Sequence, residues 1–146
     1  MKYFLHAILF LIFSSGCSYK NAYTSFDINT TTELFESNTQ SVKISSKEQG
    51  VQGIISATYL NNIYKNRFSD EEVFLISLYL KDKDVHYKFL LNNKEHLRIE
   101  DINSSHQEWK DNFKIVFKKS LFSDLNLTFD NGQLNSAVIK YQKERE

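Results

Sequence analysis

Hydrophobic residues recur with a period of two through most of the chain after Ser41, in short runs rich in Val, Ile, Phe and Tyr. Alternation of this kind places successive side chains on opposite faces of an extended backbone. Charged or asparagine-containing breaks separate the runs, as is typical of strands joined by turns. The pattern predicts strands at residues 42–46, 53–60, 73–80, 85–91, 97–99, 113–118, 125–129 and 137–141.

The run at residues 73–80 (VFLISLYL) differs from the others because it is hydrophobic at nearly every position. Continuous hydrophobicity over a run of this length predicts a central strand that is buried on both faces. Residues 69–72 (SDEE) offer a second interpretation, in which a capping box opens a helix. The β-branched and aromatic content of the run favours the strand.

The regular spacing of these strands predicts a mainly β fold, an antiparallel β-sandwich with immunoglobulin-like architecture. A true immunoglobulin domain is not expected, because the chain has one cysteine and cannot form the internal disulfide. Asp130, Asn131 and Gly132 predict a tight hairpin turn before the last strand, since these residue types accept the left-handed backbone conformation. We expect residues 41–146 to form this one domain.

Residues 18–40 are rich in Ser, Thr and Asn, and this composition predicts a flexible tether. Scattered hydrophobic residues leave an alternative open, in which the segment docks on the domain as a first strand or a short helix. The residues that would make this contact are Phe26, Ile28, Leu34 and Phe35.

The first residues have the layout of a secretory signal peptide. Lys2 supplies a positive charge, residues 3–13 (YFLHAILFLIF) form an apolar core, and small residues follow directly. In a helix this core would cover roughly 16 Å, against about 30 Å of hydrocarbon in a bilayer. A permanent membrane span is therefore the weaker interpretation, and we expect residues 1–16 to be the signal peptide.

The segment Ser14-Ser15-Gly16-Cys17 resembles the signal ending of bacterial lipoprotein precursors, in which the cysteine becomes the first mature residue. Ser14 stands where that family usually has leucine, so ordinary signal cleavage after Gly16 stays open. Without lipid, an exported chain would carry Cys17 as a lone thiol in an oxidising compartment. The resemblance implies a diacylglyceryl group on Cys17, with residues 17–40 as lipidated N-terminus and tether.

The resemblance also implies a location in the cell envelope. Two or three acyl chains hold a protein firmly at a membrane, where one chain gives only reversible binding. Ser18 is not the aspartate that retains such lipoproteins at the inner membrane in enteric bacteria. The outer membrane is therefore favoured over the inner membrane.

Charge and motif content narrow the possible functions. The 18 basic residues equal the 18 acidic residues, so no excess of positive charge indicates a nucleic-acid partner. The 4 glycines form neither a phosphate-binding loop nor a dinucleotide fingerprint. Ser104-Ser105-His106 places a hydroxyl beside an imidazole, but adjacent loop residues rarely meet the geometry that a nucleophile needs. We expect no enzyme, no catalytic residue and no cofactor.

Three histidines, His86, His96 and His106, recur at ten-residue intervals, and the pairing of strands can bring such positions together around a metal. Their spacing matches no known ligand motif, so surface imidazoles are the simpler interpretation and no metal is expected. We also interpret the acidic residues 70–72 and the basic pair Lys118-Lys119 as solvated faces.

Three aromatic residues are candidates for an interaction surface. Trp109 follows a polar segment and has the size of an interface anchor, although a lone tryptophan more commonly lies in the core. Tyr59 and Tyr64 flank two asparagines in a segment of the kind that recognises sugars or peptides.

These observations favour a membrane-anchored lipoprotein of the cell envelope that acts as a non-catalytic protein-interaction module with an envelope protein partner. The alternative is a periplasmic or surface lipoprotein that binds a metal, a glycan or a peptide. An envelope hydrolase is the third interpretation, and the sequence contains no recognisable acid–base pair for it.

Overall fold

The computed structural model describes residues 32–46, 50–81, 87–103, 110–130 and 136–144. Within these ranges the protein is mainly β, and each strand pair is antiparallel. The predicted signal peptide, the predicted lipidation site Cys17 and most of the predicted tether lie outside the described residues.

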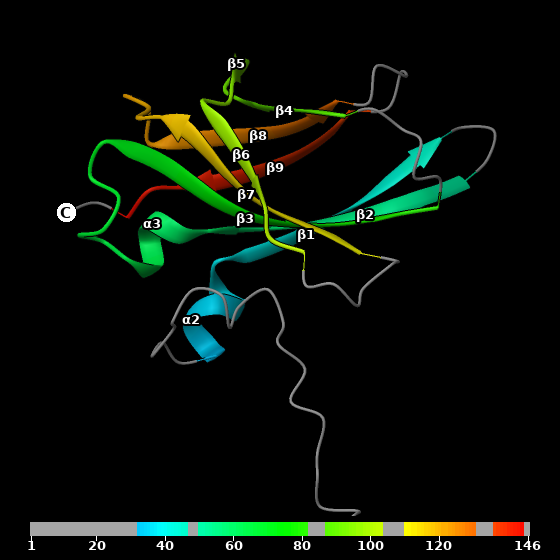
Figure 1. Ribbon diagram of the computed structural model, residues 1–146, viewed down its shortest axis with the longest axis horizontal. Coiled ribbons are helices and arrows are strands. Elements are labelled where there is room, and N and C mark those ends of the chain that lie inside the picture. Colours follow the sequence, from blue (N-terminus) through cyan, green and yellow to red (C-terminus); the bar gives the residue numbers. More distant parts are fainter. Residues whose placement is uncertain (1–31, 47–49, 82–86, 104–109, 131–135, 145–146) are drawn as a thin grey trace, which may run out of the picture.

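The strands form two sheets, with the strand orders β1-β2-β3-β7-β6 and β5-β4-β8-β9 (Figure 1). The first three strands are consecutive neighbours, whereas the chain crosses between the sheets after β3, after β5 and after β7. The elements are α2 (Thr32–Ser37), β1 (Thr39–Ser46), β2 (Gly50–Tyr59), α3 (Leu60–Ile63), β3 (Glu71–Leu80), β4 (Lys88–Leu91), β5 (Lys94–Glu95), β6 (Arg98–Asp101), β7 (Asp111–Lys118), β8 (Asp124–Asp130) and β9 (Ala137–Gln142).

The main hydrophobic core lies between the two sheets, so the arrangement is sandwich-like. Alternate residues of β8 and β9 point into this core, as the two-residue periodicity predicts. The ring of Phe74 on β3 lies within 6 Å, centroid to centroid, of three other rings, Tyr59, Phe117 and Tyr141. These aromatic side chains come from both sheets and join them at the centre of the fold.

Strand β3 is buried on both faces, as predicted, and the helical interpretation of this segment is wrong. Phe74 and alternate residues after it face the core between the sheets. Val73 and Leu75 face the opposite way and pack with Phe35 of α2 and Leu60 of α3 in a second hydrophobic cluster. The two helices therefore cover part of the outer face of the five-stranded sheet.

The folded part of the protein includes residues that the sequence assigns to the tether. Helix α2 and the first residues of β1 precede residue 41, the predicted start of the domain. Phe35 is 8% exposed and packs in the second cluster, which confirms the alternative of a short docked helix at this position. Leu34 is 44% exposed, and Phe26 and Ile28 lie outside the described residues.

The structure also tests the end of one predicted strand and the predicted hairpin near the C-terminus. The run predicted to end at Leu60 ends at Tyr59, because Leu60 begins α3. Strands β8 and β9 pair as predicted, but the turn residues Asn131 and Gly132 lie outside the described residues. Within β2, Gly53 lies so close to β3 that a Cβ would collide with the carbonyl oxygen of Tyr79.

Candidate interaction loop

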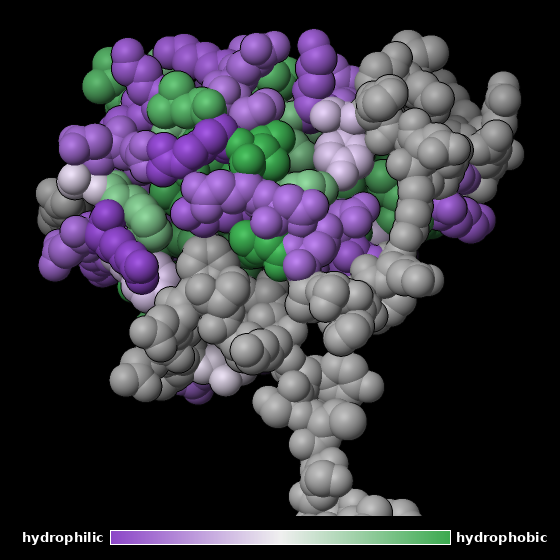
Figure 2. All heavy atoms as spheres, viewed as in Figure 1, coloured by the Kyte–Doolittle hydropathy of each residue, from purple (hydrophilic) through white to green (hydrophobic). Residues whose placement is uncertain are grey.

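The loop between β7 and β8 carries the two most exposed large hydrophobic side chains of the described residues. We call residues 119–123 the display loop; it joins one sheet to the other. Leu121 is 99% exposed and Phe122 is 65% exposed. Figure 2 shows hydrophobic surface among hydrophilic side chains at the end of the molecule where Figure 1 places this connection.

Ser120 is the point at which the display loop is fixed to the rest of the fold. Its N–H donates to Oε1 of Glu72 at 3.0 Å, and its carbonyl oxygen accepts a hydrogen bond from Nζ of Lys143 at 2.6 Å. Its Oγ accepts the backbone N–H of Phe122 at 3.1 Å. Both backbone polar groups of Ser120 are therefore bound by charged side chains, an arrangement stronger than neutral hydrogen bonding.

The carboxylate that holds Ser120 is buried. Glu72 is 0% exposed and forms an ion pair with Lys143, with 2.5 Å between Oε1 and Nζ. The hydroxyl of Tyr59 donates to its other oxygen, Oε2, at 2.5 Å. The pKa of Tyr59 is raised far above its ordinary value. The largest cause is burial of the hydroxyl, followed by its hydrogen bond to Glu72 and by the negative charge of Glu72. The hydroxyl therefore stays protonated as a donor, and a buried charge that would be costly alone is fully partnered.

A turn of the second sheet supports the display loop from the other side. The turn between β4 and β5 contains Asn92 and Asn93, both in the left-handed region with φ of 48° and 64°. Asparagine tolerates this conformation better than most residues. Nδ2 of Asn92 donates to Oγ of Ser120 at 3.3 Å and to the carbonyl oxygen of Asp124 at 3.2 Å. The loop is thus held at its start and at its end.

The site exposes hydrophobic side chains rather than reactive groups. Both oxygens of Glu72 are occupied and the residue has no exposed surface, so it offers no acid or base to a ligand. Leu121 and Phe122 project from a base that is fixed by hydrogen bonds. The site fits the binding of another molecule through hydrophobic contact.

The predicted surface residues have different positions in the structure. Tyr59 is 1% exposed and supports the buried ion pair, so the expectation of an exposed ring at this residue is wrong. Tyr64 is half-buried; it packs edge-on against Phe68, and the guanidinium of Arg67 lies 5.8 Å from its ring centre. Trp109 lies outside the described residues.

The charged clusters also differ from the sequence interpretation. Asp70, Lys118 and Lys119 are exposed, as predicted for solvated faces. Glu72 is buried, so the interpretation of residues 70–72 as a wholly solvated cluster is wrong. Glu72 is buried because it lies on the core face of β3, where Lys143 and Tyr59 approach from distant parts of the chain.

The structure bears on a metal site and on a membrane-spanning helix only within the described residues. His86 and His106 lie outside the described residues, and the ring of His96 packs edge-on against Phe117. Among the residues that the structure describes, no group of three or more His, Cys, Asp or Glu side chains is placed to hold a metal ion. In the same part of the chain, no helix has the length and apolar character that crossing a bilayer requires.

The sequence carries a signal for the display loop that the alternating pattern of the strands does not include. Residues 118–124 read KKSLFSD, in which two large apolar residues follow a basic pair without the alternation of a strand. Such a pair between two predicted strands must either fold back on the core or remain exposed. Only the structure distinguishes these outcomes.

The fold and the site define a mainly β, sandwich-like protein that displays a fixed hydrophobic loop at one end. Comparison of the chain with protein-family models, with curated proteins and with solved structures gave no match.

Proposed function

We propose that this protein is a lipid-anchored, non-catalytic interaction module of the cell envelope, and that the display loop is its contact surface. The observation that carries this proposal is the exposure of Leu121 and Phe122 on a loop whose base is held by a buried ion pair. The envelope protein partner predicted from the sequence and the immunoglobulin-like architecture both stay predictions.

The construction of the loop supports a binding role. Burying a carboxylate and an ammonium group costs free energy that their mutual attraction offsets only with good geometry and additional hydrogen bonds. In this protein the ion pair of Glu72 and Lys143, with its hydrogen bonds to Ser120, holds one short loop. Exposed hydrophobic residues gain nothing from solvent, whereas on contact with another apolar surface they gain about 25 cal/mol for each Å² buried. A fixed loop also loses little conformational freedom when it binds.

The lipid anchor explains how such a small surface would act. A module held at the membrane meets its neighbours at a high effective concentration, so each contact can be weak. The anchor proposed at Cys17, with the outer membrane favoured, supplies this proximity.

Mass spectrometry of the mature N-terminus tests the anchor. In membrane fractions of cells that express the full chain, we expect a mature protein that begins at Cys17 and carries a diacylglyceryl group. The Cys17→Ser variant removes the thiol that accepts the lipid, so the lipidated species should disappear completely. A mature protein with an unmodified Cys17 in the soluble fraction would overturn the anchor.

Thiol labelling in isolated envelopes tests the display loop. Cys17 is the only natural cysteine, and lipidation blocks its thiol. We expect Leu121→Cys to be labelled several-fold less in envelopes than after the same sample is denatured, because a neighbour covers the loop. The matched control is Val138→Cys on β9, where the native side chain is 44% exposed. Equal labelling of both positions in envelopes would contradict a role for the loop in contact.

A further inference from the structure

We infer that the display loop seats on the anionic surface of a lipid bilayer, with Leu121 and Phe122 in the apolar region and lysines at the headgroups. This inference rests on the proposed role of the loop as a contact surface and names its partner. It does not depend on lipidation of Cys17.

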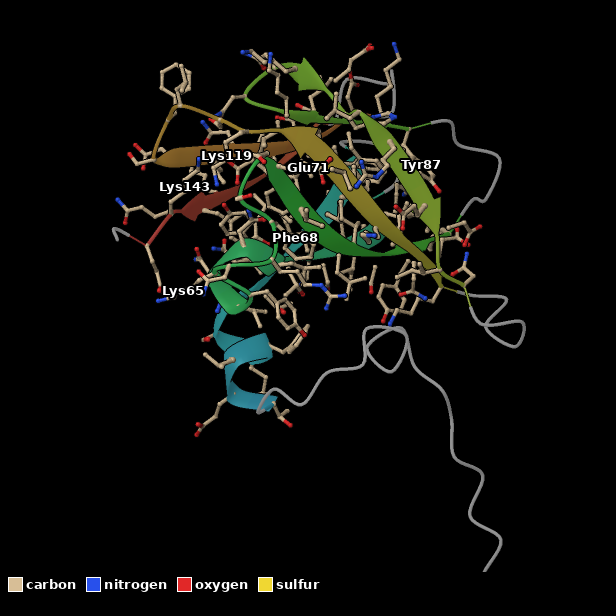
Figure 3. All side chains as sticks on the ribbon, turned by 60° about the vertical axis from the view of Figure 1, so that its left-hand side comes forward. Lys65, Phe68, Glu71, Tyr87, Lys119 and Lys143 are labelled. Carbon is tan, nitrogen blue, oxygen red and sulfur yellow. The ribbon has the colours of Figure 1, made fainter. Side chains whose placement is uncertain are left out.

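Charge around the loop favours an anionic surface. Lys118 and Lys119 directly precede the apolar pair and are exposed, and Asp124 is the only acidic residue in residues 118–124. Two further lysines lie at the same end, but each is in an ion pair, Lys143 with Glu72 and Lys65 with Glu144, so they add no net charge. Figure 3 shows Lys65, Lys119 and Lys143 along one side of the molecule, with Tyr87 on the opposite side. Exposed lysines next to apolar side chains are the combination that anionic bilayers bind.

The shape of the loop distinguishes a bilayer from a protein partner. Leu121 is 99% exposed, so it forms a projecting tip rather than the wall of a groove. A stable protein interface buries about 800 Å² on each partner, which two side chains cannot supply. A bilayer accepts a narrow apolar projection because its acyl chains rearrange around it.

A third exposed hydrophobic side chain lies at the same end. Leu97 is 59% exposed, and its backbone N–H donates to the carbonyl oxygen of Val116, two residues before the end of β7 at Lys118. The β4–β5 turn that supports the display loop is followed by Lys94, which is also exposed. Basic and apolar residues of both sheets therefore meet at this end of the protein.

Fluorescence quenching by brominated lipids tests this inference on the full chain. The variant Phe122→Trp places a reporter at the tip, and the unaltered chain, which keeps Trp109, supplies the background. The matched control is Val138→Trp, because Val138 pairs with Thr128 toward the end of β8 that lies farthest from the display loop. Vesicles of phosphatidylethanolamine with phosphatidylglycerol are compared with vesicles of phosphatidylcholine alone, and urea unfolding confirms that each variant is folded.

We expect the emission of the tryptophan at residue 122 to shift to shorter wavelength and to be quenched in vesicles that contain phosphatidylglycerol, while the control is unaffected. Replacing Lys118 or Lys119 by serine should lower the ratio of docked to undocked protein about fivefold for each lysine. Absence of quenching at residue 122, or equal quenching at residue 138, would overturn the inference. If the loop is nevertheless protected in envelopes, the proposed function stands and the partner is a protein.

Discussion

Replacement of Glu72 by alanine should lower the free energy of unfolding by about 3–5 kcal/mol, the cost of breaking a buried ion pair from one side. The substitution leaves Lys143, whose side chain is 20% exposed, without its carboxylate, and it leaves the hydroxyl of Tyr59 without its acceptor. Denaturant unfolding measures the change directly.

The neighbouring residue provides a control for charge. Glu71 accepts two hydrogen bonds from Arg98, at 2.8 and 3.0 Å, but this pair is exposed to solvent. Solvent screens exposed pairs, so Glu71→Ala should cost much less than Glu72→Ala. Similar losses in the two variants would show that Glu72 does not act as a buried, partnered charge.

The Glu72 variant also tests the link between the ion pair and the display loop. The N–H of Ser120 donates to Oε1 of Glu72, so its hydrogen exchange should become faster in Glu72→Gln under native conditions. Glutamine keeps an acceptor oxygen but loses the charge that pairs with Lys143. Unchanged exchange at Ser120 would contradict a role for the charge of Glu72 in holding the loop.

Replacement of Phe74 by alanine should lower the free energy of unfolding by about 3–5 kcal/mol, because the cavity left in the core is lined by rings that cannot collapse into it. Phe74 is 0% exposed, and its ring centre lies 5.0 Å from that of Tyr59, 5.5 Å from Tyr141 and 5.9 Å from Phe117. Thermal and denaturant unfolding should give the same ranking of variants.

Phe122→Ala is the matched control, since it makes the same chemical change on an exposed side chain. Its effect on unfolding should stay within about 0.5 kcal/mol. Combined with Leu121→Cys, a stable Phe122→Ala protein that has lost envelope protection would separate the binding role of this residue from the stability of the fold. A loss comparable to that of Phe74→Ala would contradict the exposed position of the ring.

Much of the strand structure follows from local patterns in the sequence. Alternation at residues 125–129 and 137–141 predicts strands with one buried face, and β8 and β9 have this pattern. Continuous hydrophobicity at residues 73–80 predicts the doubly buried strand β3. These predictions succeed because the side-chain period of a strand depends on neighbouring residues alone.

The contacts that cover each strand were harder to predict. Phe35 lies in a polar segment that resembles a tether, yet it packs on the outer face of the five-stranded sheet through α2. Burial at this position depends on Val73 and Leu75, which lie far along the chain. A composition rule cannot detect such a partner.

By itself the sequence determined that the protein is mainly β, which residues alternate between core and solvent, and which strand is central. Only the long-range packing shows that Glu72 is buried while Glu71 beside it is partly exposed, and that Leu121 and Phe122 remain outside the core. Residues distant in sequence determine which side chains are buried and which groups they bind. Glu72 accepts a hydrogen bond from Ser120, 48 positions along the chain, and its other two partners are Tyr59 and Lys143.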